Sequence, residues 1–145
     1  MKLLFVVILL LGSLFLLNQN TLFHDKHKVT EPLNAVTYLS YENAVKEAKK
    51  SHKVIMMKLT TAHCSYCKKM DREVFLDKEV IAFLSKYFIS VEIDVENEPI
   101  PLGIKRTITP TFIFIDKEEK ILSRIPGSWN KKDFLDLLNN RIDNK

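Results

Sequence analysis

The stretch that decides the fold is Val54-Ile-Met-Met-Lys-Leu-Thr-Thr-Ala-His-Cys-Ser-Tyr-Cys67. Its first six residues are mostly apolar, which is typical of a strand covered on both faces of a sheet. Helical spacing follows the second cysteine, with Met70, Val74 and Phe75 as one apolar set. The two cysteines therefore lie where a strand ends and a helix begins.

This position suits redox chemistry. Unpaired backbone N–H groups and the helix dipole favour an anion at a helix N-terminus, so a thiolate at Cys64 gains stabilisation there. Cys67 follows one turn later and is placed to attack a mixed disulfide held on Cys64. We therefore assign Cys64 as the nucleophile and Cys67 as the resolving thiol.

Two alternative roles of the cysteine pair stay open. A purely stabilising disulfide is disfavoured, because a loop of four residues gains only about 2 kcal/mol in the chain-entropy model. A non-catalytic module could instead hold Cu(I) or another soft metal through His63, Cys64 and Cys67, since thiolates suit such ions. A zinc site is not predicted, because it needs about four ligands.

The rest of the chain alternates helices and strands. A break near Leu76, with Asp77 as a cap, divides the helical region after the cysteines, and Ser40 and Asn130 stand at the starts of two other helices. The pattern predicts helices at 41–50, 65–87 and from 130 onward, strands at 54–59, 88–95, 111–115 and 120–125, and an extra strand near 35–39. In the strand at 88–95, Ser90, Glu92 and Asp94 form the polar side. We expect an α/β fold with a mixed central sheet of about four to five strands, flanked by helices on both faces.

The N-terminus has the pattern of an export signal. Lys2 precedes an apolar run from Leu3 to Leu17, which is the layout of a secretory segment. Residues 1–20 are predicted to be a signal peptide or an uncleaved membrane anchor, residues 21–33 a linker and residues 34–145 the folded domain. The net charge of +4 comes from interspersed lysines and acids, whereas a nucleic-acid binder more often carries a basic stripe. No nucleic-acid partner is expected.

In their order and spacing, these features resemble the thioredoxin superfamily. The matching residues are the strand and cysteine pair above, Val91–Val95, Thr109-Pro110-Thr111-Phe112 and Pro126-Gly127. The run His63-Cys-Ser-Tyr-Cys-Lys-Lys-Met70, followed by Glu73-Val-Phe75, is similar to exported bacterial thioredoxin-like proteins and to the soluble domain of DsbD-type thiol reductases.

The resemblance implies roles for further residues. Pro110 is expected to be cis, with Thr109 offering its backbone to an extended substrate, and Tyr66 faces the substrate or covers the helix start. Lys58 stands where thioredoxin has a buried acid that assists proton transfer. A buried, unpaired lysine would be costly, so Lys58 is expected to turn outward or to pair with an acid. His63 is expected to tune the redox properties of Cys64.

The resemblance also implies an activity. We expect a periplasmic thiol–disulfide oxidoreductase, soluble or anchored to the inner membrane, that reduces protein disulfides with no cofactor beyond its own cysteine pair and with no metal. A membrane thiol reductase of the DsbD or CcdA type is its expected electron donor. A disulfide oxidant or isomerase is the alternative within the same chemistry, because reduction potential sets the direction of electron flow.

Overall fold

The computed structural model describes residues 35–142 of the chain. The predicted signal segment at 1–20 and linker at 21–33 lie outside the described residues, so both stay predictions. The domain expected at 34–145 contains all of the described residues. Among them, no helix is both long enough and apolar enough to cross a membrane.

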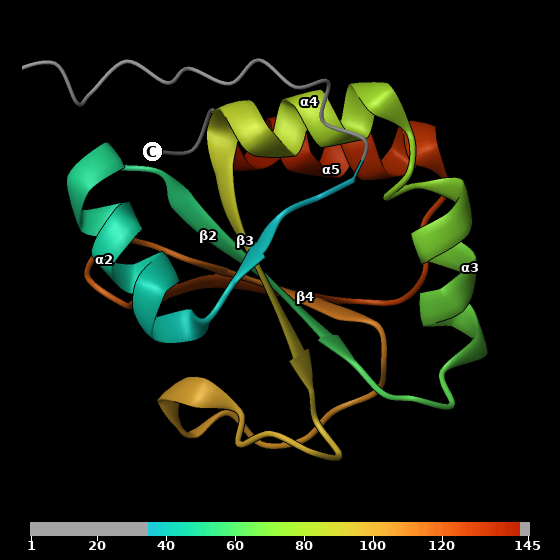
Figure 1. Cartoon of the computed structure of the whole chain (residues 1–145), viewed down its shortest axis with the longest axis horizontal. Coiled ribbons are helices and arrows are strands. Elements are labelled where there is room, and N and C mark those ends of the chain that lie inside the picture. The colour runs from blue at the N-terminus through green and yellow to red at the C-terminus, as the bar shows by residue number, and fades with distance from the viewer. Residues whose placement is uncertain (1–34, 143–145) are drawn as a thin grey trace, which may run out of the picture. The chain divides into compact units, whose positions relative to one another are not determined.

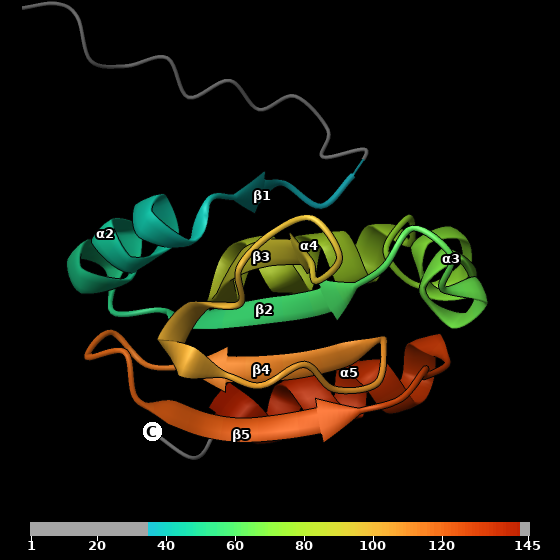
Figure 2. The same cartoon turned by 90° about the horizontal axis from the view of Figure 1, so that it is seen from below.

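Five strands form one mixed sheet, in the order β1-β3-β2-β4-β5 (Figure 1). The strands are β1 (Tyr38–Leu39), β2 (Val54–Thr60), β3 (Phe88–Asp94), β4 (Thr111–Ile115) and β5 (Ile121–Pro126). The first three run parallel to one another, and β4 is antiparallel to both β2 and β5 (Figure 2). The predicted α/β fold with a mixed sheet is confirmed.

Helices cover both faces of the sheet, and the alternation of β2 shows which helix covers which face. Val54 and Met56 pack in one apolar cluster with residues of α3 (Ser65–Glu73), α4 (Lys78–Tyr87) and α5 (Lys131–Ile142). Ile55 and Met57 belong to a second cluster, which includes the buried residues of α2 (Tyr41–Ser51). Because β2 is buried on both faces, its sequence is nearly continuous in apolar residues. In Figure 1, α4 and α5 lie side by side, away from α2.

Local capping sets the helix starts, as the sequence predicts. Ser40 Oγ accepts a hydrogen bond from the backbone N–H of Asn43 at 3.4 Å. The Asp77 carboxylate accepts from the N–H groups of Glu79 and Val80 at 2.9 and 3.3 Å, which starts α4 after the break that follows α3. Each side chain satisfies backbone donors that have no partner inside the helix.

An aromatic cluster packs the turn that follows α3 against the sheet and α5. The Phe75 and Phe112 ring centroids lie 6.1 Å apart, and Phe134 of α5 lies 5.4 and 5.0 Å from these two rings. Phe112 is the second residue of β4, which begins directly after Pro110. The cluster therefore connects the turn after α3 to the strand that follows the proline.

The extra strand expected near 35–39 is confirmed, although it is shorter and spans only Tyr38–Leu39. One detail of the predicted strands is wrong. Ser90, expected on the polar side of its strand, is buried at 6% exposure, because β3 lies between β1 and β2 and helices cover both of its faces. Tertiary position, rather than local alternation, decides the burial of a central strand.

Candidate active site

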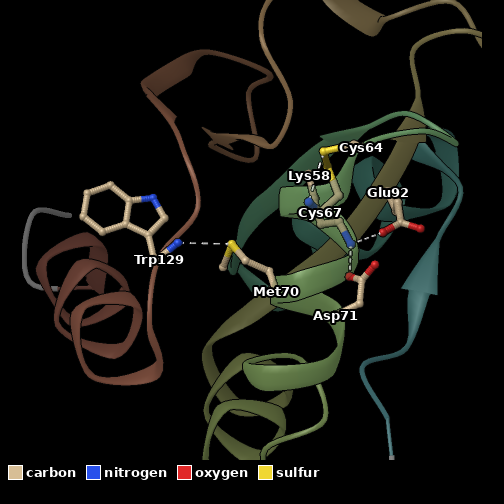
Figure 3. A network of polar contacts seen from close by, with 7 residues as sticks. All are labelled: Lys58, Cys64, Cys67, Met70, Asp71, Glu92 and Trp129. Carbon is tan, nitrogen blue, oxygen red and sulfur yellow. Dashed lines mark hydrogen bonds and ion pairs between the residues drawn. A yellow bond between two sulfur atoms is a disulfide. The ribbon is translucent and has the colours of Figure 1, made fainter.

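The two cysteines form a disulfide at the start of α3 (Figure 3). Cys64 is the N-cap residue, and its Sγ accepts a hydrogen bond from the backbone N–H of Cys67 at 3.0 Å. A sulfur atom thus stands where helices usually place a serine or aspartate oxygen. In the reduced protein the same N–H and the helix dipole can stabilise a thiolate on Cys64.

The two sulfur-bearing residues differ in exposure. Cys64 retains 8% of its surface and Cys67 only 1%, whereas the neighbouring Tyr66 is 64% exposed. An incoming disulfide can therefore reach Cys64 but not Cys67, which agrees with the assignment of Cys64 as nucleophile. The ring of Tyr66 is therefore accessible to a bound substrate.

Thr109 and Pro110 lie at the same edge of the sheet as the cysteines. Leu59 of β2 pairs with Thr111 of β4, so the residues that follow Leu59 and those that precede Thr111 meet at that edge. The Thr109–Pro110 peptide bond is cis, as the resemblance implies.

The backbone N–H of Gly127 donates a hydrogen bond to the carbonyl oxygen of Pro110 at 2.9 Å, which connects the residues before β4 to the end of β5. Gly127 has a φ of 109°, which only glycine adopts readily.

Lys58 is buried at 1% exposure and forms ion pairs with two carboxylates (Figure 3). Its Nζ donates to Asp71 Oδ1 of α3 at 2.5 Å and also contacts Glu92, its direct neighbour on β3. The Phe75 ring centroid lies 4.8 Å from the same nitrogen, and the Tyr38 centroid 5.6 Å. The lysine therefore pairs with acids, and the alternative that it turns outward is wrong.

Asp71 and Glu92 are functional candidates that the sequence did not reveal. Asp71 stands four residues after Cys67, a spacing that puts two side chains on one face of a helix, and this is the signal that could have found it. Glu92 could not be found without the strand register. Both carboxylates also act on Tyr38: burial, and then the charges of Glu92 and Asp71, raise the pKa of its hydroxyl.

The alternative metal site gains no support from the arrangement of side chains. Within residues 35–142, no three His, Cys, Asp or Glu side chains gather as a metal ion would require. The exposed His63 directly precedes Cys64, and the two cysteine sulfurs are bonded to each other. The role of His63 as a redox modulator stays a hypothesis.

Comparison with known proteins agrees with this geometry. Residues 41–142 match the model of a family described as a thioredoxin-like domain. A thioredoxin from Thermus thermophilus is 25% identical, with 74% of this chain and 87% of that one covered and a TM-score of 0.63.

Two further solved structures share the fold. A DsbH oxidoreductase is 21% identical to this chain, and the match covers 83% of this chain and 95% of the other, with a TM-score of 0.62. A putative disulphide isomerase from Bacteroides thetaiotaomicron is 23% identical, and the match covers 77% of this chain and 97% of the other, with a TM-score of 0.63.

One curated relative is much longer. Spermatogenesis-associated protein 20 from Homo sapiens is 30% identical over 83 residues, which are 55% of this chain and 11% of that protein. The chain thus spans about a ninth of the length of that relative.

The family match covers every described element from α2 to α5, and within it the disulfide caps a helix that directly follows the central strand β2. The chain therefore belongs to the thioredoxin-like domain family, and its Cys64–Cys67 disulfide stands at the start of α3.

Proposed function

We propose that the protein reduces disulfides of other proteins in the periplasm. The observation that carries the proposal is the unequal pair at the start of α3, a reachable Cys64 that caps the helix and a buried Cys67. A thiolate that a substrate disulfide can reach starts the exchange, and a fully buried thiol completes it. This difference between the two cysteines suits a reductase, because the buried Cys67 can displace the reduced substrate from Cys64.

The exchange has two steps. The Cys64 thiolate attacks a substrate disulfide, one substrate sulfur leaves and takes a proton, and a mixed disulfide remains. Cys67 then loses its proton and attacks Cys64 Sγ, so that the second substrate sulfur leaves. The substrate gains two electrons and two protons, and the Cys64–Cys67 disulfide forms. A membrane thiol reductase of the DsbD or CcdA type would return the two electrons.

Two observations favour reduction over oxidation. The described chain between β2 and β3 holds α3 and α4 alone, whereas oxidants of the DsbA type carry a helical insertion. In addition, the charges of Lys58, Asp71 and Glu92 sum to minus one (one cation and two carboxylates) beside the helix of the cysteines. Negative charge disfavours thiolates, which lowers the reduction potential of the pair.

The reduction potential tests the direction of electron flow. The full chain would be equilibrated in glutathione or dithiothreitol buffers and its thiols counted. We expect a reduction potential of about −270 mV, the level of thioredoxin, together with reduction of insulin disulfides. A reduction potential of about −120 mV would indicate an oxidant and overturn the proposal. A tight stoichiometric Cu(I) complex without disulfide exchange would support the metal-binding alternative.

The same titration tests His63. A cationic ring beside Cys64 would stabilise the thiolate, so His63→Gln is expected to lower the reduction potential. The change should stay within about 30 mV, or about 1.4 kcal/mol, because the side chain is exposed to solvent. An unchanged potential would show that His63 does not tune the pair.

The proposed location rests on the apolar run from Leu3 to Leu17. A reporter that is active only outside the cytoplasm would be fused to the C-terminus of the full chain. We expect activity with the natural N-terminus and none when the run is interrupted by Leu9→Arg and Leu10→Arg. Equal activity of both fusions would contradict export by this segment.

A further inference from the structure

The second step of the exchange requires a proton acceptor. A thiolate rather than a thiol attacks a disulfide, so Cys67 must lose its proton before it attacks Cys64. Cys67 is only 1% exposed, and bulk water therefore has little access to its sulfur. The proton must pass to a group near the first turns of α3.

Asp71 is placed for this role. It stands four residues after Cys67 on α3, so their Cβ atoms are about 5–6 Å apart on the same helix face. Glu73, the other acid of α3, stands six residues after Cys67, which turns it to a different face, and it pairs with Lys69. The remaining charged residues of the helix, Lys68 and Arg72, are cations and accept no proton.

Neighbouring residues hold the Asp71 carboxylate in place and leave it exposed to solvent. Lys58 of β2 donates to it from a buried position, Glu92 of β3 binds the same lysine, and Tyr38 of β1 keeps its own proton because burial raises its pKa (Figure 3). The Asp71 side chain is 49% exposed. It lines a pocket of about 180 Å³ together with Glu92, Tyr38 and Phe75. Water in this pocket can carry a proton from the carboxylate to the solvent.

We propose that Asp71 accepts the proton of the Cys67 thiol, through a water molecule, and that Lys58 is the positioning residue that holds its carboxylate. The proposal rests on the disulfide-exchange function argued above. The S–H bond of Cys67 breaks, its electron pair forms the bond to Cys64 Sγ, and the bond from Cys64 to the substrate sulfur breaks. The leaving thiolate takes a proton from water, and protonated Asp71 releases its own proton into the pocket.

The two steps can be timed separately with dithiobis(nitrobenzoate) and the reduced full chain. Attack by Cys64 releases one coloured thiolate at a rate that depends on reagent concentration. Attack by Cys67 releases the second at a rate that does not. For Asp71→Asn we expect the second rate to fall at least about tenfold near neutral pH, in line with the loss of a general base, while the first stays within about twofold.

The pH profile separates proton transfer from a structural effect. In Asp71→Asn the second rate should rise in proportion to hydroxide, because hydroxide must replace the carboxylate, whereas the natural protein should depend less steeply on pH. Asp71→Glu keeps a carboxylate and should retain the second rate within about threefold. Glu73→Gln, on the same helix, is the matched control and should change neither rate.

Each result has a defined meaning. Equal second rates and pH profiles for Asp71→Asn and the natural protein would overturn the proposal while leaving the disulfide exchange intact. A slow, hydroxide-dependent second step in Asp71→Glu would also overturn it and provides the decision if Asp71→Asn does not fold. If the natural protein released no coloured thiolate at all, the proposed function would fail, and this inference with it.

Discussion

The burial of Lys58 leads to a prediction about the free energy of unfolding. The charged side chain is 1% exposed and depends on two carboxylates, those of Asp71 and Glu92, which are 49% and 36% exposed. Asp71→Asn or Glu92→Gln alone leaves one carboxylate in place, and solvent screens the pair that is lost. We expect each single change to lower the free energy of unfolding by about 1 kcal/mol.

The double variant should behave differently. With both acids neutral, Lys58 keeps its charge in a buried site that has no carboxylate, and breaking a buried pair in this way costs about 3–5 kcal/mol. Subtracting about 2 kcal/mol for the two single changes leaves a coupling of about 1–3 kcal/mol. Adding Lys58→Met removes the buried charge and should bring stability back to within about 1.5 kcal/mol of the natural protein.

Urea denaturation of the oxidised full chain measures all of these values in one experiment. Glu73→Gln supplies the control, because its ion pair with Lys69 is exposed and should contribute less than about 1 kcal/mol. The reasoning is refuted if the two single effects simply add and Lys58→Met restores nothing. In that case the lysine would not behave as a buried charge that depends on its partners.

Four further variants test the cysteine pair, a partly buried tyrosine and the aromatic cluster. Cys67→Ser should accumulate a mixed disulfide with substrate, visible on a non-reducing gel, and Cys64→Ser should lower insulin reduction by about 10²-fold or more; turnover by either near the natural rate would contradict their roles. Burial, and then the charge of Glu119, raise the pKa of Tyr41 to about 12, so the stability it contributes is present below about pH 10 and is lost as the pH rises through about 12. Urea midpoints measured at about pH 8 and pH 11 should therefore differ less in Tyr41→Phe than in the natural protein, and an equal difference would argue against the shift. Phe134→Ala should lower the free energy of unfolding by about 3–5 kcal/mol, since its ring joins α5 to β4 and to the turn after α3. A loss below about 1 kcal/mol would show that the cluster is loosely packed.

The helix starts were predictable because their causes are local. Ser40, Asp77 and Asn130 each bond to a backbone N–H two or three residues ahead, so a short window of sequence contains both the donor and the acceptor. The position of Cys64 at a helix start follows in the same way. An apolar run that ends just before it and helical spacing just after it are both visible without any knowledge of the fold.

The environment of the cysteines was only partly predictable. The cost of a buried, unpaired lysine predicts that Lys58 has a partner, but not which one. Asp71 lies 13 residues away along the chain, and Glu92 is a neighbour only through the register of two parallel strands. Sequence spacing alone does not determine such a register, because it depends on how the whole sheet packs.

Residues close together in the chain therefore set the order of the elements, the helix caps and the position of Cys64 at the start of α3, because each of these depends on local interactions. The tertiary structure decided that Cys67 and Lys58 are each 1% exposed, that Ser90 is buried, and that Asp71 and Glu92 converge on the lysine. The physical reason is that burial and ion pairing depend on which elements pack together, and that arrangement is a property of the whole fold.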